Sequence, residues 1–274
     1  MAIDINDAFV KQFESEVHMA YQRMGSKLRN TVRYKGNVRG SSTTFQKVGK
    51  GTAGTKSRHG NVPVMTIDHT PVECTLTDFY AADYIDKLDE LKINHDERMV
   101  VTQSAAAAMG RKTDDLIIAA LDTTSNVATE AGTTGLNQTK INTVFEYFGN
   151  NDVPDDGERY FVISPGAWTD LLGLNAFASA DFVGMDELPY KGGMVAKRWM
   201  GFMWMTFSGL PIATNIRKNF AFHRSAIGVA AGSEVQTEMN YVPEKAAHLA
   251  TSMMSQGAVL IDNFGAYEVQ AYDV

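Results

Sequence analysis

The stretch KVGKGTAGTKSRHG, residues 47–60, is the part of the chain that comes closest to a chemical motif. In a phosphate-binding loop, two glycines separated by four residues are followed at once by Lys and Ser or Thr. Here Thr55 separates the second glycine from Lys56. Such a loop also continues into a helix whose N-terminal amides bind the phosphate, and Gly60 and Pro63 disfavour a helix at that place. The sequence therefore argues against a nucleotide site.

No other pattern in the chain matches a catalytic or metal-binding motif. The six histidines are dispersed without metal-ligand spacing, no G-x-S-x-G sequence occurs, and Cys74 is the single cysteine. The stretch NNDVPDDG, residues 150–157, resembles a calcium loop. Its aspartates lack the alternation and the final glutamate of such a loop, which favours a polar turn. We therefore expect no catalytic residue, no metal and no cofactor.

The charge of the chain is unevenly distributed. Its formal net charge is −7, yet no acidic residue lies between Glu16 and Asp68. A basic segment in an acidic chain is typical of nucleic-acid contact, or of association with the acidic part of a neighbouring copy. The negative total charge argues against a dedicated DNA-binding protein, because phosphate contacts dominate the affinity of such proteins. The bases of this interval are Arg23, Lys27, Arg29, Arg33, Lys35, Arg39, Lys47, Lys50, Lys56 and Arg58.

Length and composition indicate a globular protein made in a reducing compartment. The 274 residues, 44% of them hydrophobic, suffice for a sizeable core in one large or two joined domains. No stretch approaches the roughly 20 apolar residues of a membrane span. The acidic and polar N-terminus differs from a signal peptide, and a lone cysteine excludes an internal disulfide. We expect a cytosolic protein without membrane contact.

The first 70 residues predict a helix and a long arm. Residues 5–29 carry apolar side chains at spacings of three and four, which indicates an amphipathic helix that packs on its own core or on another subunit. Residues 31–70 alternate as strands do on both sides of the glycine-rich stretch, with 61–67 as the returning strand. Because a two-stranded arm is marginal alone in water, we expect a partner subunit to cover it. The alternative is a disordered surface loop.

The next segment combines acids with a long helix. Residues 97–122 are rich in good helix formers and predict a helix that serves as the spine of a domain. The acids of residues 78–97 are typical of a solvated face, and they are also the electrostatic counterpart of the basic arm. These acids are Asp78, Asp83, Asp86, Asp89, Glu90, Asp96 and Glu97.

The second half of the chain alternates helical and strand patterns after a Thr/Gly-rich boundary at 123–137. It predicts a helix at 139–149, a buried strand RYFVIS, and a short helix that begins at Pro165. The last 18 residues, GAVLIDNFGAYEVQAYDV, predict a terminal hairpin that turns near 263–265. Residues 244–256 fit helix and strand equally.

The order of these parts resembles the major capsid proteins of tailed bacteriophages. The resemblance rests on the helix, the basic arm, the acidic strand and the spine helix, followed by RYFVISPGAWTDLL, GGMVAKRWMGFMWMTFSGLPI and FAFHRSAIGVAAG. It implies an α+β protein with the Hong Kong 97-type capsid fold. The implied parts are an N-terminal arm helix at 1–30, an extended loop at 31–72, a peripheral domain at 73–122, an axial domain at 123–243, and strands at 244–274 that return to the peripheral domain.

The resemblance also implies a function and partners. The protein would assemble with itself, as hexamers and pentamers, into an icosahedral virion shell around packaged double-stranded DNA. Assembly in the host cytoplasm and a portal are expected. Because the chain opens directly at the arm helix, we also expect a separate scaffolding protein. Some family members link loop lysines covalently to asparagines of neighbours, but no sequence feature here marks such a pair.

The glycine-rich stretch would then be the tip of the extended loop, lying across the neighbouring subunit. Its glycines let the tip conform to slightly different neighbours. We expect its bases to meet the acidic segment across the subunit boundary. The residues of this hypothesis are Lys47, Lys50, Lys56 and Arg58 on one side, and Asp78, Asp83, Asp86, Asp89 and Glu90 on the other.

Three other interpretations remain open from the sequence. One is the shell protein of a cellular nanocompartment with the same fold. Another is a soluble α+β enzyme or ligand-binding protein in which residues 174–193 form a lid, although no polar cluster converges on a pocket. The third is a DNA-binding protein that uses the basic arm, which should interleave stacking aromatics and has few.

Overall fold

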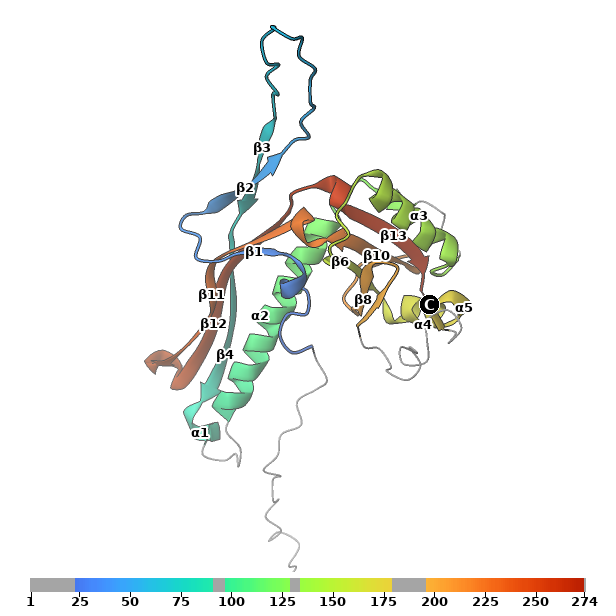
Figure 1. Ribbon diagram of the computed structural model, residues 1–274. Helices are drawn as coiled ribbons and strands as arrows, with labels where there is room; N and C mark the ends of the chain where they lie inside the picture. The colour runs from blue at the N-terminus through green and yellow to red at the C-terminus, as the bar shows by residue number, and fades with distance from the viewer. Residues whose placement is uncertain (1–22, 91–96, 129–133, 179–195, 274) are drawn as a thin grey trace, which may run out of the picture. The chain divides into compact units, whose positions relative to one another are not determined.

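The computed structural model describes residues 23–90, 97–128, 134–178 and 196–273 (Figure 1). The chain divides into two compact units. The smaller unit contains Met1–Ser26, Asp78–Lys112 and Glu234–Met254. The larger unit contains Lys27–Thr77, Thr113–Ser233 and Ser255–Val274. No helix in the described residues is long and apolar enough to cross a membrane.

The larger unit is built on a seven-stranded sheet with the order β5-β13-β10-β6-β8-β7, in which β9 also pairs with β10. Phe161 of β6 and Trp204 of β8 stack in its core, with ring centroids 4.2 Å apart. The elements are β5 (Val127–Ala128), α3 (Gln138–Asn150), β6 (Arg159–Ile163), α4 (Pro165–Leu172), α5 (Asn175–Ala178), β7 (Lys197–Trp199), β8 (Phe202–Thr206), β9 (Ile212–Ala213), β10 (Ile216–His223) and β13 (Ala266–Tyr272).

The predicted helices and the buried strand of this unit are confirmed. Helix α4 begins where Ser164 accepts the amide proton of Ala167 and Pro165 occupies the first turn. Helix α3 begins in the same way, because the Asn137 side chain accepts the amide proton of Lys140. Their apolar faces pack against the sheet through residues such as Phe148 and Trp168, both almost fully buried.

A second sheet, with the order β1-β11-β12-β4, contains strands that run through both units. Its strands are β1 (Arg33–Lys35), β4 (Thr77–Asp86), β11 (Ile227–Val242) and β12 (Ala247–Leu260). The ambiguous residues 244–256 therefore lie mostly in a strand. The turn near 263–265 is confirmed as a 3₁₀ turn, Asn263–Gly265. The prediction of a terminal hairpin is wrong, because β13 pairs with β10 and β5, while β12 pairs in the other sheet.

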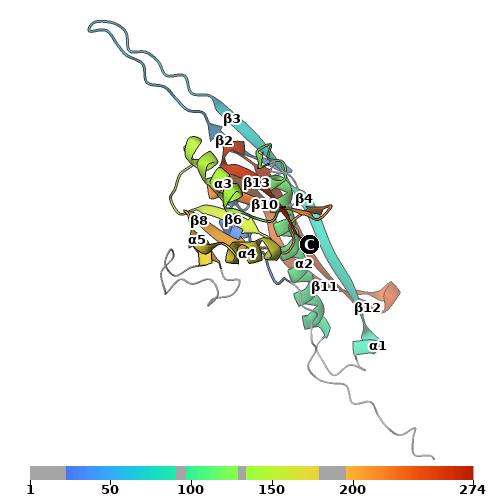
Figure 2. The ribbon, with the colours of Figure 1, turned by 90° about the vertical axis from the view of Figure 1, so that its right-hand side faces the viewer.

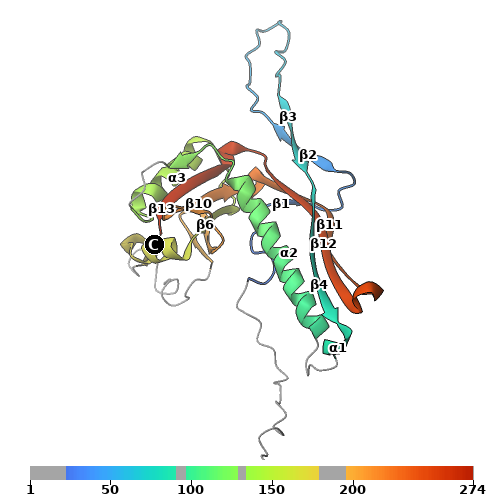
Figure 3. The ribbon, with the colours of Figure 1, turned by 180° about the vertical axis from the view of Figure 1, so that it is seen from behind.

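The smaller unit contains a long helix and β4 side by side (Figures 1 and 3). Helix α2 runs over Glu97–Leu121, which confirms the predicted spine helix, and its last residues belong to the larger unit. A short helix, α1 (Lys87–Glu90), follows β4 directly. The amide of Leu88 donates to the Asp86 carboxylate at 2.7 Å, and this bond caps the first turn of α1.

The extended loop is an antiparallel pair of strands whose far end carries no strand (Figure 2). Strand β2 (Ser42–Val48) pairs with β3 (His69–Thr75), and the amide of Gly49 donates to the Asp68 carbonyl at 2.8 Å. The returning strand predicted at 61–67 is wrong, because the glycine-rich residues opposite offer no partner strand and Pro63 has no amide proton to donate.

The base of the loop is anchored in the larger unit. Phe45 of β2 and Cys74 of β3 are buried in a small cluster with Ala230 and Ile261. The predicted strand near Tyr34 is present as β1, but it pairs in parallel with β11 rather than within the arm. Two strands of the arm are therefore held at one end, while the remainder extends beyond the paired residues.

The predicted helix over 5–29 is not formed at residues 23–28, and residues 1–22 lie outside the described part. Gly25 has φ +70°, a left-handed conformation that interrupts a helix. The amides of Lys27 and Leu28 donate to the Asp114 carboxylate at 3.2 and 3.0 Å instead of to helical carbonyls. A 3₁₀ turn, Arg29–Thr31, follows.

Candidate assembly surfaces

The tip of the extended loop, residues 49–68, presents its bases to solvent. The side chains of Lys50, Lys56 and Arg58 are exposed. A Cβ atom at Gly54 would lie 2.8 Å from the Pro63 ring across the loop, and one at Gly51 would collide with Met65. These glycines therefore let the two sides of the tip approach closely.

Two of the four predicted bases have acidic partners in the same chain. Lys47 Nζ lies 2.8 Å from Asp262 Oδ1, with both side chains about one-third exposed. Lys50 Nζ lies 3.0 Å from Asp152 Oδ2, and both of these side chains are 80% exposed, so water screens the pair strongly. Lys56 and Arg58 form no ion pair with any described residue.

The predicted acids belong to the other unit. Asp78, Asp83 and Asp86 are exposed on β4, and none of them forms an ion pair within the described part of the chain. The side chains of Asp89 and Glu90 lie outside the described residues. No ion pair joins the described acids to the bases of the tip, and the pairing between copies stays a prediction.

The smaller unit also exposes apolar side chains, which the sequence analysis missed. Tyr80 is 69% exposed and Leu88 is 65% exposed. Lysines accompany the aromatic rings: Lys245 Nζ lies 4.0 Å from the centre of the Tyr84 ring. Where such side chains form a contiguous patch they mark interaction sites, whereas single exposed ones are normal. The large exposed apolar residues of this unit are Met24, Tyr80, Tyr84, Leu88, Met99, Val235 and Tyr241.

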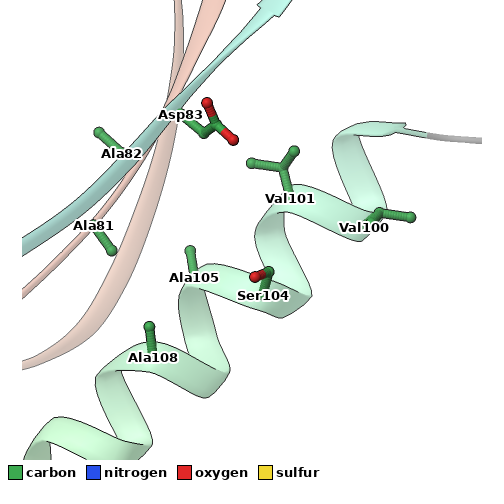
Figure 4. Close-up of a pocket in the computed structure, with 8 residues that line it drawn as sticks. All are labelled: Ala81, Ala82, Asp83, Val100, Val101, Ser104, Ala105 and Ala108. Carbon is green, nitrogen blue, oxygen red and sulfur yellow. The ribbon is translucent and has the colours of Figure 1, made fainter. Parts of the chain in front are cut away.

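A groove of about 330 Å³ lies between β4 and α2 of the smaller unit (Figure 4). Most of its lining is small and apolar, while Asp83 and Ser104 supply its polar side chains. The lining contains a single titratable group, so it offers no acid–base pair for catalysis. Its lining is suited to contact with apolar side chains. The lining residues are Ala81, Ala82, Asp83, Val100, Val101, Ser104, Ala105 and Ala108.

In the larger unit, one cluster brings together two carboxylates and a histidine. The ligand-type atoms of Asp156, Glu158 and His223 lie within 4.8 Å of one another. His223 is buried; its Nδ1 accepts from the Ser225 amide at 3.3 Å, and its Nε2 lies 3.2 Å from Asp156 Oδ1. This arrangement places the ring proton on Nε2, where it faces the carboxylate rather than leaving a lone pair for a metal.

The cluster of Asp156, Glu158 and His223 extends through Arg224 into a network of ion pairs and hydrogen bonds. Arg224 donates to Glu158 Oε1 at 2.6 Å. The pKa of the Asp156 carboxyl lies below its usual range because the Glu158 amide and the His223 ring donate hydrogen bonds to it. The network ties the turn at 150–157 to the end of β10. The polar turn predicted there is confirmed, with Asp152 and Gly157 at positive φ.

The sequence of the chain matches one family model. The phage capsid protein model matches residues 5–272, nearly the whole chain. No curated protein sequence matches the chain.

Several solved capsid structures share the fold of the chain. The capsid of cyanophage P-SCSP1u superposes with a TM-score of 0.79 at 19% identity, over 100% of this chain and 96% of the other. A structure from Mycobacterium phage Che8 gives 0.78 at 15% identity, over 96% and 97%. The capsid of Ralstonia phage GP4 gives 0.71 at 13% identity, over 100% and 98%. The predicted α+β, Hong Kong 97-type capsid fold is therefore confirmed.

Proposed function

Because the chain belongs to the phage capsid protein family, we propose that its copies assemble as hexamers and pentamers into the icosahedral shell of a tailed phage. The shell encloses the double-stranded DNA genome within the virion, and it is built in the host cytoplasm with a separate scaffolding protein and a portal. Its role is structural rather than catalytic.

The extended loop is the observation that supports this proposal most directly. Its strands are anchored by buried Phe45 and Cys74, yet the far end leaves Val62 and Val64 exposed at 71% and 90%. A two-stranded arm with exposed apolar residues is marginal in water. A neighbouring copy that covers it removes this apolar surface from water and orders the tip.

The charges of the tip fit the acidic surface of the smaller unit. Lys56 and Arg58 are the strongest candidates, because Lys47 and Lys50 already have acidic neighbours in their own chain. We propose that these bases contact acids of a second copy. The acids are Asp78, Asp83, Asp86, Asp89 and Glu90.

Charge reversal tests the pairing between copies. The triple variant Lys50→Glu, Lys56→Glu, Arg58→Glu should keep the fold, because these side chains are exposed, and should weaken shell formation seen by electron microscopy. Reversal of Asp78, Asp83 and Asp86 to Lys in the same chain should restore assembly. Normal assembly of the triple variant would refute the pairing.

A further inference from the structure

A basic hollow in the larger unit is not used by the assembly surfaces described above. Its volume is about 520 Å³. The 3₁₀ turn at 29–31, strand β1 and the turn after β10 supply its walls. It is lined by Arg29, Asn30, Val32, Tyr34 and Arg224. Two guanidinium groups, one amide and one phenol thus line a single hollow.

The contacts of the two arginines hold them in place. Arg29 Cζ lies 4.3 Å from the centre of the Tyr34 ring, a cation–π distance. Tyr34 is itself held in β1, opposite Val229 of β11. Arg224 is fixed by its backbone amide, which donates to the Glu158 carbonyl at 3.1 Å, and by its side-chain bond to Glu158. Arginine side chains held in this way lose little rotamer freedom when they bind an anion.

The positive charge continues beyond the hollow. Lys27, Arg33, Lys35 and Arg39 are exposed on the same segment, and no acid occurs in it. Within β1, Arg33 and Lys35 lie on the face opposite Tyr34, near the Phe45 ring. Two carboxylates near the segment are engaged: Asp114 accepts the amides of residues 27 and 28, and Glu158 pairs with Arg224. A segment whose bases extend beyond the hollow suits an extended polyanion better than a single small anion.

We propose that this hollow binds a phosphodiester group of the enclosed DNA, with Arg29 and Arg224 donating hydrogen bonds to the phosphate oxygens. Asn30 adds an amide donor, and the other bases of the segment increase the attraction for the polyanion. The inference rests on the proposed function, since it identifies where the shell protein touches its genome. Contact with phosphates alone binds DNA of any sequence.

The test is the salt dependence of binding to a fluorescent 30-base-pair duplex, followed by anisotropy with the full-length protein. Each phosphate contact on B-DNA contributes about 0.9 to the slope of log affinity against log salt concentration. The variant Arg29→Gln, Arg224→Gln should lower that slope by about 0.9, because the two arginines contact a single phosphate. The charge-matched control Lys87→Gln, Lys245→Gln, in the smaller unit, should leave the slope unchanged.

Two further measurements make the result decisive. The variant Arg29→Lys, Arg224→Lys keeps both charges and should retain most of the slope, which separates loss of phosphate contact from loss of fold. A slope for the glutamine variant equal to that of the control would overturn the proposal. So would a glutamine variant that fails to form shells but binds DNA normally, because the hollow would then serve an acidic surface of a neighbouring copy.

Shell formation by the unaltered protein is scored separately by electron microscopy. If the unaltered protein forms no shells, the capsid proposal fails, whereas the slopes still decide whether the hollow binds DNA. If shells form and the slopes agree between glutamine variant and control, only the phosphate site fails.

Discussion

Lys47 Nζ lies 2.8 Å from Asp262 Oδ1. This ion pair joins the end of β2 in the extended loop to the turn that follows β12. The ring of Phe264 lies 5.5 Å from the same ammonium group. Both partners of the ion pair belong to the larger unit and to one chain. This contact distinguishes Lys47 from the bases at the tip, which lie beyond the paired strands.

The first prediction concerns this ion pair. Lys47→Met should lower the free energy of unfolding in urea by no more than about 1 kcal/mol, because both side chains are partly solvated. Shell formation should persist, since Lys47 already has its partner within the chain. A folded Lys47→Met protein that forms no shells would place Lys47 among the contacts between copies instead.

Asp114 should be important for stability where the N-terminal segment meets the larger unit. It is fully buried and accepts the amides of Lys27 and Leu28. Asp114→Ala leaves both amide protons without this acceptor, at a cost of roughly 1–3 kcal/mol for each buried group. Asp114→Asn keeps one side-chain oxygen and should cost less. Equal unfolding free energies for the two variants would contradict this role.

Two glycines should respond to substitution by alanine with opposite signs. At Gly257 of β12, a Cβ atom would collide with the Thr75 carbonyl oxygen of β3, so Gly257→Ala should destabilise by about 1–3 kcal/mol. At Gly149 of α3, a Cβ atom meets nothing within 4 Å. Gly149→Ala should stabilise by up to about 1 kcal/mol. Thermal unfolding of both variants measures the difference, and a stabilising Gly257→Ala would refute the close approach.

Lys218 should make stability depend on alkaline pH. Its pKa is raised, chiefly by a hydrogen bond to Asp122 and also by the charge of Glu268. A lysine whose pKa is raised on folding contributes its full stabilisation at a pH below its unfolded-state pKa of about 10.4. This stabilisation is lost as the pH rises through the folded-state pKa. The gap in unfolding free energy between the unaltered protein and Lys218→Met should therefore be largest below pH about 10 and shrink above it. A gap that does not change with pH would contradict this coupling.

The elements that local chemistry determines could be predicted from the sequence. Helix α2 follows from its good helix formers, and α4 from a serine cap followed by Pro165. The basic arm and the acidic segment follow from composition alone. The order of these parts was also enough to indicate the fold, although each pattern taken singly was weak.

Pairing between distant segments could not be predicted. Residues 61–67 have the alternation of a strand, but no partner strand lies opposite them. The chain after β12 turns as predicted, yet β13 pairs with β10 and β5 instead of with β12. The predicted helix does not include residues 23–28, because Gly25 has a positive φ and Asp114, far along the chain, accepts the amides of Lys27 and Leu28. The hollow unites Arg29 with Arg224, whose proximity no local pattern reveals.

The most direct test of assembly through the extended loop replaces residues 50–67 by Asn-Gly. The Gly49 amide already donates a hydrogen bond to the Asp68 carbonyl. A two-residue turn should therefore close β2 and β3 into a short hairpin and preserve the anchored base. Electron microscopy and light scattering would compare this variant with the unaltered protein. We predict closed shells from the unaltered protein and a folded, unassembled variant with the same melting temperature within a few degrees. Shells from both proteins, or a monomer from the unaltered protein at every concentration, would contradict the account.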